Sequence, residues 1–208
     1  RDHHGCHQLK SQLPLKKLNP EQQMALLKSL GRSDSIDILD YNISLEIIDF
    51  VDQRIDGNCR IQFMLIEEDT REMELDLLQL EVDSVHLNGA LVGYTYDGDR
   101  LNIELPAGMN TENLYEVTVY YGGRPTVATS GFGGMAFQGG IAYNLGIGLG
   151  ETPYNFGRSW FPCFDNFVER STYSLNIISA NGRKAYCSGL FVEEEALDAI
   201  IMAMVLHA

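Results

Sequence analysis

Apolar and polar residues alternate one by one along much of the chain between Ile36 and Tyr121. In residues 41–47, for example, Tyr, Ile and Leu occupy every second position, with Asn, Ser and Glu between them. The same alternation recurs in four further segments: 59–65, 73–77, 101–105 and 115–121. A period of two is typical of strands with one buried and one wet face, so we expect Glu72, Glu74 and Asp76 on a wet face.

Glycine-containing pairs separate several of these segments and predict tight turns. Asn88-Gly89 is a strong hairpin signal, and Asp56-Gly57 and Asp97-Gly98 are further turn signals. Short strands at this spacing, each with one polar face, predict a mainly β fold in which antiparallel sheets stack as a sandwich or saddle.

One segment has the period of a helix instead. Asn19 can cap it, Pro20 suits the first helical position, and Gln22 stands where a capping box places Gln. Apolar residues then recur on one face, at Met24, Leu27 and Leu30. We therefore expect one short helix near residues 20–31, inside an N-terminal extension that covers residues 1–35.

Residues 122–150 are rich in Gly and small side chains. One interpretation is a set of short strands and turns, and the other is a loop that lines a cleft, because Gly permits positive φ and close approach of the backbone. A phosphate-binding loop is excluded, since no Gly-Lys-Ser or Gly-Lys-Thr is present.

Charge and composition exclude several kinds of partner. The formal net charge is -14, whereas binding to nucleic acid or anionic lipid needs a concentrated basic surface. No apolar run has the length of a membrane span; the nearest is 199–206, which is too short.

The four cysteines form no CxxC pair and permit either two disulfides or four thiols. Localisation is left open, with export preferred to the cytoplasm.

A ligand-rich cluster stands at the start of the chain. Imidazole and thiolate groups can hold a soft metal, and the residues are His3, His4, Cys6 and His7. An irregular terminus is the preferred interpretation of this segment, so no metal site is predicted.

Two segments resemble the N-terminal domain of the aminopeptidase N-like zinc metallopeptidases, the gluzincin aminopeptidases. The first is 37–45 with 55–61, which is similar to the opening hairpin of that family. The second runs Gly157-Arg158-Ser159-Trp160-Phe161-Pro162-Cys163-Phe164-Asp165-Asn166 and continues with Arg170-Ser171-Thr172-Tyr173. It is the more specific match, because it fixes several unusual residues over a short span.

The resemblance implies a β-saddle domain that packs on a thermolysin-like catalytic domain and walls the substrate cleft. In such enzymes a helical HExxH and a later Glu hold zinc. None of the five histidines here begins an HExxH, and Gly133-Gly134-Met135-Ala136-Phe137 lacks the Glu of the family's Gly-x-Met-Glu-Asn. We therefore expect no catalytic residue, no metal and no cofactor in this chain, with zinc confined to a catalytic domain and peptide as the substrate of the parent aminopeptidase.

The resemblance also suggests roles for individual residues. The family's N-terminal domain supplies a Gln or Glu that binds the free amine of the substrate, but Pro153 stands at the best-matching position. Glu151 is the nearest acid and takes that role if the loop shifts; otherwise it is an exposed loop residue. Structural roles are expected for four residues of the second segment, namely Arg158, Trp160, Pro162 and Asp165. A Tyr143-Asn144 pair faces either the domain junction or the core.

The resemblance extends over residues 36–190, which we take as the β-saddle domain, and leaves 191–208 as an atypical apolar tail. If exposed, this tail would favour self-association. Two other hypotheses stay open. One is a stand-alone β-sandwich that binds a peptide or glycan through the Gly-rich loops, and the other is a complete enzyme with an unrecognised site.

Overall fold

The computed structural model describes residues 19–151, 154–166, 168–180, 183–196 and 199–206. One α-helix, α2 (Pro20–Gly31), is followed by the short 3-10 helix η2 (Arg32–Asp34), and a second 3-10 helix, η3 (Gly157–Ser159), lies late in the chain. The strands are β1 (Ile36–Asp49), β2 (Arg54–Leu65), β3 (Glu72–Asp76), β4 (Glu81–Leu87), β5 (Ala90–Leu91), β6 (Tyr94–Tyr96), β7 (Arg100–Glu104), β8 (Leu114–Gly123), β9 (Gly133–Gln138), β10 (Ile141–Gly148), β11 (Thr172–Ala180), β12 (Leu190–Ala196) and β13 (Ala199–Leu206). The predicted mainly β fold is confirmed, and the short helix expected near residues 20–31 is α2.

Eight strands form one large sheet in the order β12-β13-β11-β1-β2-β8-β4-β5. Its neighbours are antiparallel except β1 and β11, which run parallel from Asp40↔Thr172 to Ile47↔Ser179. The expectation of purely antiparallel sheets therefore needs correction to a mixed sheet. A parallel pair needs a long crossover rather than a hairpin, and the whole segment from β2 to residue 171 supplies it.

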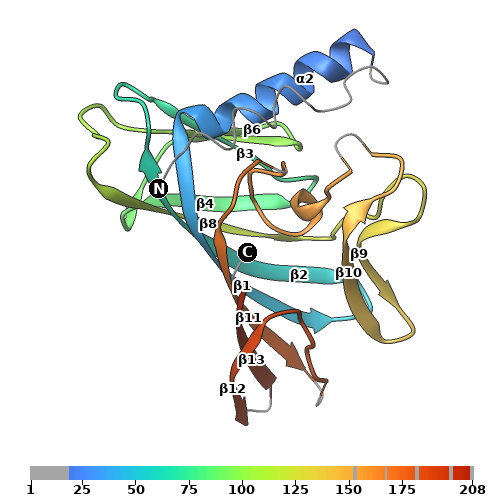
Figure 1. Cartoon of the computed structure of the whole chain (residues 1–208). Coiled ribbons are helices and arrows are strands. Elements are labelled where there is room, and N and C mark those ends of the chain that lie inside the picture. The colour runs from blue at the N-terminus through green and yellow to red at the C-terminus, as the bar shows by residue number, and fades with distance from the viewer. Residues whose placement is uncertain (1–18, 152–153, 167, 181–182, 197–198, 207–208) are drawn as a thin grey trace.

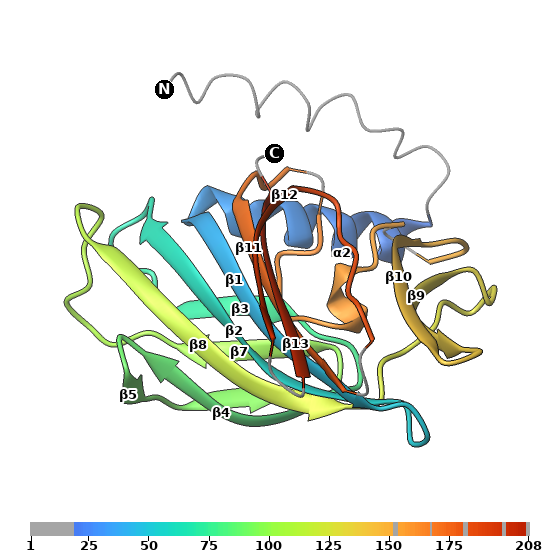
Figure 2. The same cartoon turned by 90° about the horizontal axis from the view of Figure 1, so that it is seen from below.

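Two small sheets complete the fold, one of order β3-β7-β6 and one formed by β9 and β10. Figures 1 and 2 place the β9–β10 hairpin at one end of the large sheet and α2 along one border, next to the strands of the β3-β7-β6 sheet. The chain between β10 and β11 runs through the space between these parts (Figure 1).

The core lies between the large sheet and the β3-β7-β6 sheet. Alternation predicted its members in the middle of β1 and β2, where every second residue is buried: Tyr41, Ile43, Leu45, Cys59, Ile61 and Phe63. From the other side come Met73, Leu75, Leu101 and Ile103, each fully buried. Burying one such apolar side chain stabilises a fold by about 2 kcal/mol, so this double row is the main source of stability.

Two of the three turn signals mark turns. Asn88 and Gly89 both have positive φ in the β4–β5 hairpin, and Gly98 has φ +95 between β6 and β7. The prediction for Asp56-Gly57 is wrong, because these residues lie inside β2 and the turn falls at 50–53. Gly57 is needed there for another reason, since a Cβ would collide with the carbonyl oxygen of Ser44 on β1.

The helix begins at the predicted capping box. Asn19 Oδ1 accepts from the Gln22 amide at 2.8 Å, and the Asn19 amide donates to Gln22 Oε1 at 3.1 Å. Leu30 is buried, whereas Met24 and Leu27 remain exposed. The helix is therefore anchored by its C-terminal end. Among the described residues, no helix is long and apolar enough to cross a membrane.

The C-terminal segment supplies β12 and β13, and β13 pairs with β11 on one side and β12 on the other. Self-association through the 199–206 side chains stays a prediction.

Three cysteines are free thiols, namely Cys59, Cys163 and Cys187. The candidate ligand cluster of His3, His4, Cys6 and His7 lies outside the described residues.

Candidate functional site

The segment 154–166, which contains the first part of the specific resemblance (157–166), folds back on the small sheet. Asp76 and Cys163 exchange two backbone hydrogen bonds, of 2.8 and 3.1 Å, and the Leu78 amide donates to the Arg158 carbonyl at 2.7 Å. The Phe164 amide donates to the Tyr41 hydroxyl at 3.0 Å, so the segment is also tied to β1. We call residues 154–166 the anchored loop.

A buried ion pair lies inside the anchored loop. Arg158 Nη1 donates to Asp165 Oδ2 at 2.6 Å and to the Asn155 carbonyl at 2.9 Å. Asp165 Oδ1 also accepts from the Gly157 amide at 3.1 Å. The guanidinium lies over the ring of Phe156, 4.7 Å from its centroid. Because both charged groups are buried and paired, this arrangement fixes the course of the loop.

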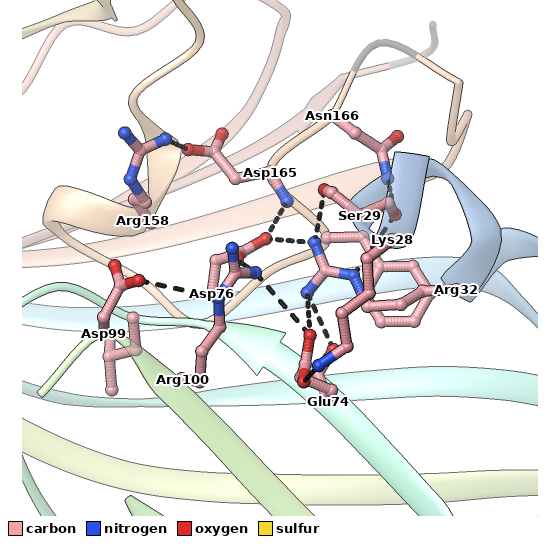
Figure 3. Close-up of polar contacts among 12 residues, drawn as sticks. Lys28, Ser29, Arg32, Glu74, Asp76, Asp99, Arg100, Arg158, Asp165 and Asn166 are labelled. Atoms are coloured by element: carbon pink, nitrogen blue, oxygen red, sulfur yellow. Dashed lines mark hydrogen bonds and ion pairs between the residues drawn. The ribbon is translucent and has the colours of Figure 1, made fainter. Parts of the chain in front are cut away.

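The ion pair continues into a larger network, which Figure 3 shows. Asp76 is 3 % exposed, and its Oδ2 accepts from Arg32 Nη2 at 2.5 Å and from the Asp165 amide at 2.9 Å. Its Oδ1 pairs with Arg100 of β7. Arg32 also donates to the Glu74 carbonyl at 2.9 Å. The expectation that Asp76 lies on a wet face is therefore wrong, because this carboxylate joins η2, β7 and the anchored loop.

Burial shifts the acid–base behaviour of the arginines in this network. Desolvation lowers the pKa of Arg32, and the neighbouring Glu74 partly opposes this shift. Desolvation and the nearby charge of Arg32 also lower the pKa of Arg100. Desolvation raises the pKa of Asp99, which lies at 3.5 Å from Arg100. These are the shifts of structural ion pairs, in which each cation stays charged at neutral pH.

Aromatic packing holds the middle of the anchored loop. Phe161 contacts Tyr41 edge-on at 5.7 Å and Trp160 at 4.5 Å between ring centroids. Phe161 and Pro162 are buried, and Trp160 packs against the core while staying partly accessible. The Pro162 carbonyl lies 3.9 Å from the Cys59 sulfur on β2. Burial raises the pKa of Tyr41, Cys59 and Cys163, so these groups stay neutral and act as packing residues.

The Gly-rich segment forms the β9–β10 hairpin, as one of the two interpretations expected. Gly133 has φ +118, and a Cβ there would collide with the carbonyl oxygen of Ile147. Gly134 has φ +75, and a Cβ there would collide with the Thr126 carbonyl oxygen. Glycine is therefore required at both positions for the hairpin to close on its neighbours.

One side of this hairpin and its flanks is apolar and exposed. We call it the hairpin face; its residues are Phe132, Ile141, Tyr143, Leu145, Ile147, Leu149 and Tyr154. Their exposed fractions run from 40 % for Tyr143 to 64 % for Ile141. Within β10, exposed residues alternate with partly buried ones from Ile141 to Leu145. Exposed apolar side chains gathered on one hairpin are a feature of interaction surfaces.

Glu151 lies beside the hairpin face. Its Oε1 accepts from the Thr129 amide at 2.8 Å and from the Thr129 hydroxyl at 2.7 Å. These two hydrogen bonds lower the pKa of the carboxyl, so it is ionised at neutral pH. Its second oxygen makes no hydrogen bond within the described part of the chain. Pro153 lies outside that part, and no metal-binding cluster of His, Cys, Asp or Glu occurs inside it.

Comparison with known proteins decides the family. The model of the peptidase M1 N-terminal domain matches residues 38–199. The chain belongs to the peptidase M1 N-terminal domain family. A search of curated proteins found no match.

Solved structures of M1 peptidases share the fold. An M1 zinc metallopeptidase from Deinococcus radiodurans superposes with a TM-score of 0.71 at 19% identity, over 82% of this chain and 39% of that one. Leukotriene A4 hydrolase from Saccharomyces cerevisiae gives 0.60 at 20% identity, over 82% and 27%. The chain thus spans less than half the length of these M1 proteins.

The M1 resemblance directed attention to Arg158 and Asp165, and the structure brings these two together. It places Glu151 elsewhere, on the hairpin side of the loop. Sequence reasoning missed Arg32, Asp76 and Arg100, which come from three distant segments. One signal was available: Asp76 stands between Leu75 and Leu77-Leu78, and an acid in such an apolar run indicates a buried partner.

Proposed function

We propose that the chain is the non-catalytic N-terminal domain of an M1 zinc metallopeptidase, where it packs on the catalytic domain and walls the substrate cleft. The observation that carries this proposal is the hairpin face, an exposed apolar surface in a family whose solved members have more than twice the length of this chain. A catalytic domain is the partner that such a surface fits, because domain interfaces bury apolar residues of this kind.

The buried network gives the hairpin face a firm support. The ion pair between Arg158 and Asp165 fixes the anchored loop on one side of Glu151. On the other side, Gly148 packs closely against both Glu151 and Phe156. A surface built on a rigid base loses little conformational entropy when a partner covers it. The face is therefore suited to a permanent interface with the catalytic domain.

Glu151 is the residue of this chain that we propose to contact substrate. Its Oε1 is held by Thr129, and the second oxygen is left to accept from the ammonium group at a peptide N-terminus. The hydrogen bonds that hold it also keep it ionised, which favours a cationic ligand.

Chemistry is assigned to the parent protein. Zinc, the activated water and the cleavage step belong to the catalytic domain, since no histidine of this sequence begins an HExxH. This chain contributes shape to the cleft and a carboxylate at its rim.

The test is complementation. The DNA that follows this sequence is searched for an HExxH segment, and the encoded catalytic domain is made separately and mixed with the chain. We expect a stable complex by size-exclusion chromatography and a rise in aminoacyl-anilide hydrolysis. Leu145→Asp with Ile147→Asp should abolish both, whereas Leu91→Asp, at a still more exposed apolar residue on β5, should change neither. Equal loss in the Leu91 variant, or no complex at all, would refute the proposal.

A further inference from the structure

The outer face of the large sheet carries a polar hollow far from the hairpin face. It has a volume of about 610 Å³ and is lined by Asn42, Ser44, Asn58, Arg60, His86, Gly89, Glu116, Thr118, Tyr120 and Asn176. Tyr41 and Cys59 face the core next to Asn42 and Asn58 in sequence. Because successive residues of a strand point to opposite faces, the hollow lies on the side of the sheet away from the anchored loop.

Strand register brings the lining residues into two rows. The first row runs Asn176, Ser44, Asn58 and Tyr120 across β11, β1, β2 and β8. The second runs Asn42, Arg60, Thr118 and His86 across β1, β2, β8 and β4. With strands about 4.8 Å apart, each row spans about 14 Å, and the rows lie about 7 Å from one another.

The depth of the hollow comes from side-chain size. In the first row three short side chains are followed by Tyr120, and in the second row the short Asn42 and Thr118 alternate with the longer Arg60 and His86. We call this hollow the trough, and the short side chains of both rows its floor.

The floor has unused hydrogen-bonding capacity. The side chains of Asn42, Ser44, Asn58 and Asn176 make no hydrogen bond with any part of the chain that the structure describes. Amide and hydroxyl groups both donate and accept, so they match hydroxyl groups, which also do both. Carboxylate or phosphate ligands would instead call for a surplus of cations.

Charge and aromatic groups narrow the ligand class further. Arg60 and Glu116 neutralise each other across a 3.7 Å ion pair, which leaves the trough without a fixed net charge from these two residues. The Tyr120 ring is 42% exposed and is held edge-on by His86, with ring centroids 5.5 Å apart. An exposed ring beside polar groups offers an apolar face on which the C–H side of a sugar ring can stack.

We propose that this trough binds a neutral oligosaccharide. The hydroxyl groups of the ligand would meet the amide and hydroxyl groups of the floor, and one of its rings would stack on the exposed Tyr120. This site is separate from the hairpin face. A sugar bound in the trough would therefore not block the proposed contact with a catalytic domain.

The experiment uses the isotope-labelled 208-residue chain and NMR titration with four neutral tetrasaccharides: maltotetraose, cellotetraose, laminaritetraose and chitotetraose. At least one should shift backbone amides of the two rows selectively. Tyr120→Ala should weaken that binding by about tenfold, the loss of one aromatic contact. Asn58→Ala should weaken it as well, through the central floor position.

Gln62→Ala is the matched control, because Gln62 lies on the same face of β2 but outside the trough. The affinity of this variant for the tetrasaccharide should equal that of the unchanged chain. Thermal unfolding of each variant separates lost binding from lost folding, and Asn176→Ala replaces any variant that fails to fold. The proposal is overturned if no tetrasaccharide shifts the row amides, if the trough variants bind like the unchanged chain, or if a neutral tetrapeptide binds there and the sugars do not.

Discussion

The anchored loop and the β9–β10 hairpin are neighbours in sequence and are stabilised in opposite ways. The anchored loop is buried and held by charged side chains, with Asp76 receiving bonds from Arg32, Arg100 and the Asp165 amide. The hairpin is exposed and held by glycine backbone, with its larger apolar side chains directed outward. The difference teaches that buried polar contacts fix the course of one segment, whereas close glycine packing lets the other segment display its apolar side chains.

The largest effect in this comparison is expected from Asp76→Ala. It leaves the buried Arg32 and the partly buried Arg100 without their shared carboxylate, and breaking a buried pair costs about 3–5 kcal/mol. Urea unfolding followed by the fluorescence of Trp160, the single Trp of the chain, measures the change. Asp99→Ala removes an acid that is half exposed, so it should cost less than about 1 kcal/mol. Similar losses in both variants would mean that the network does not anchor the loop.

A middle effect is expected from Gly133→Ala in the hairpin. The substitution combines a strained positive φ with a collision against the Ile147 carbonyl, for about 2–3 kcal/mol of local destabilisation. Gly139→Ala also places Ala at a positive φ, +60 instead of +118, but the new Cβ meets open space, so it should cost only about 1 kcal/mol. Hydrogen exchange of β9 and β10 amides reports both. Exchange that quickens equally in the two variants would show that close packing against Ile147 is unimportant.

The smallest effect is expected from Thr129→Val, which removes the hydroxyl that donates to Glu151 and so changes how stability depends on pH. The pKa of Glu151 lies below its ordinary value in the folded chain, so its contribution to stability is complete above the unfolded pKa. This contribution is lost as pH falls through the folded pKa. The variant should raise the Glu151 pKa and narrow the acidic range over which stability depends on it. Carboxyl NMR titration checks this, and an unchanged pKa would contradict the assigned hydrogen bond.

How far the sequence predicts this molecule depends on the range of the interactions. Alternation identified the core residues of β1 and β2, and the capping box identified the start of α2, because both are local patterns. The Asp56-Gly57 signal failed, since the glycine serves contact with β1 rather than a turn. The parallel pairing of β1 with β11 was also missed, because nothing local to either strand specifies a partner about 130 residues away.

The candidate site divides in the same way. Arg158 and Asp165 were within reach of sequence reasoning because they stand seven positions apart in one motif. Arg32 and Asp76 are 44 positions apart, and only the folded chain brings them together. The hairpin face was predictable as a Gly-rich segment but not as an apolar surface, since which side of β10 is covered depends on packing elsewhere.

The parallel pairing of β1 and β11 has a consequence for how the chain folds. Contacts between residues distant in sequence form late, because a long loop must close first. During synthesis, β1 can pair with β2 at once, but its other edge stays open until residues 172–180 have emerged. An unpaired strand edge is a template for aggregation. Until residues 172–180 have emerged, this edge of β1 is therefore the part of the growing chain that most needs a temporary cover.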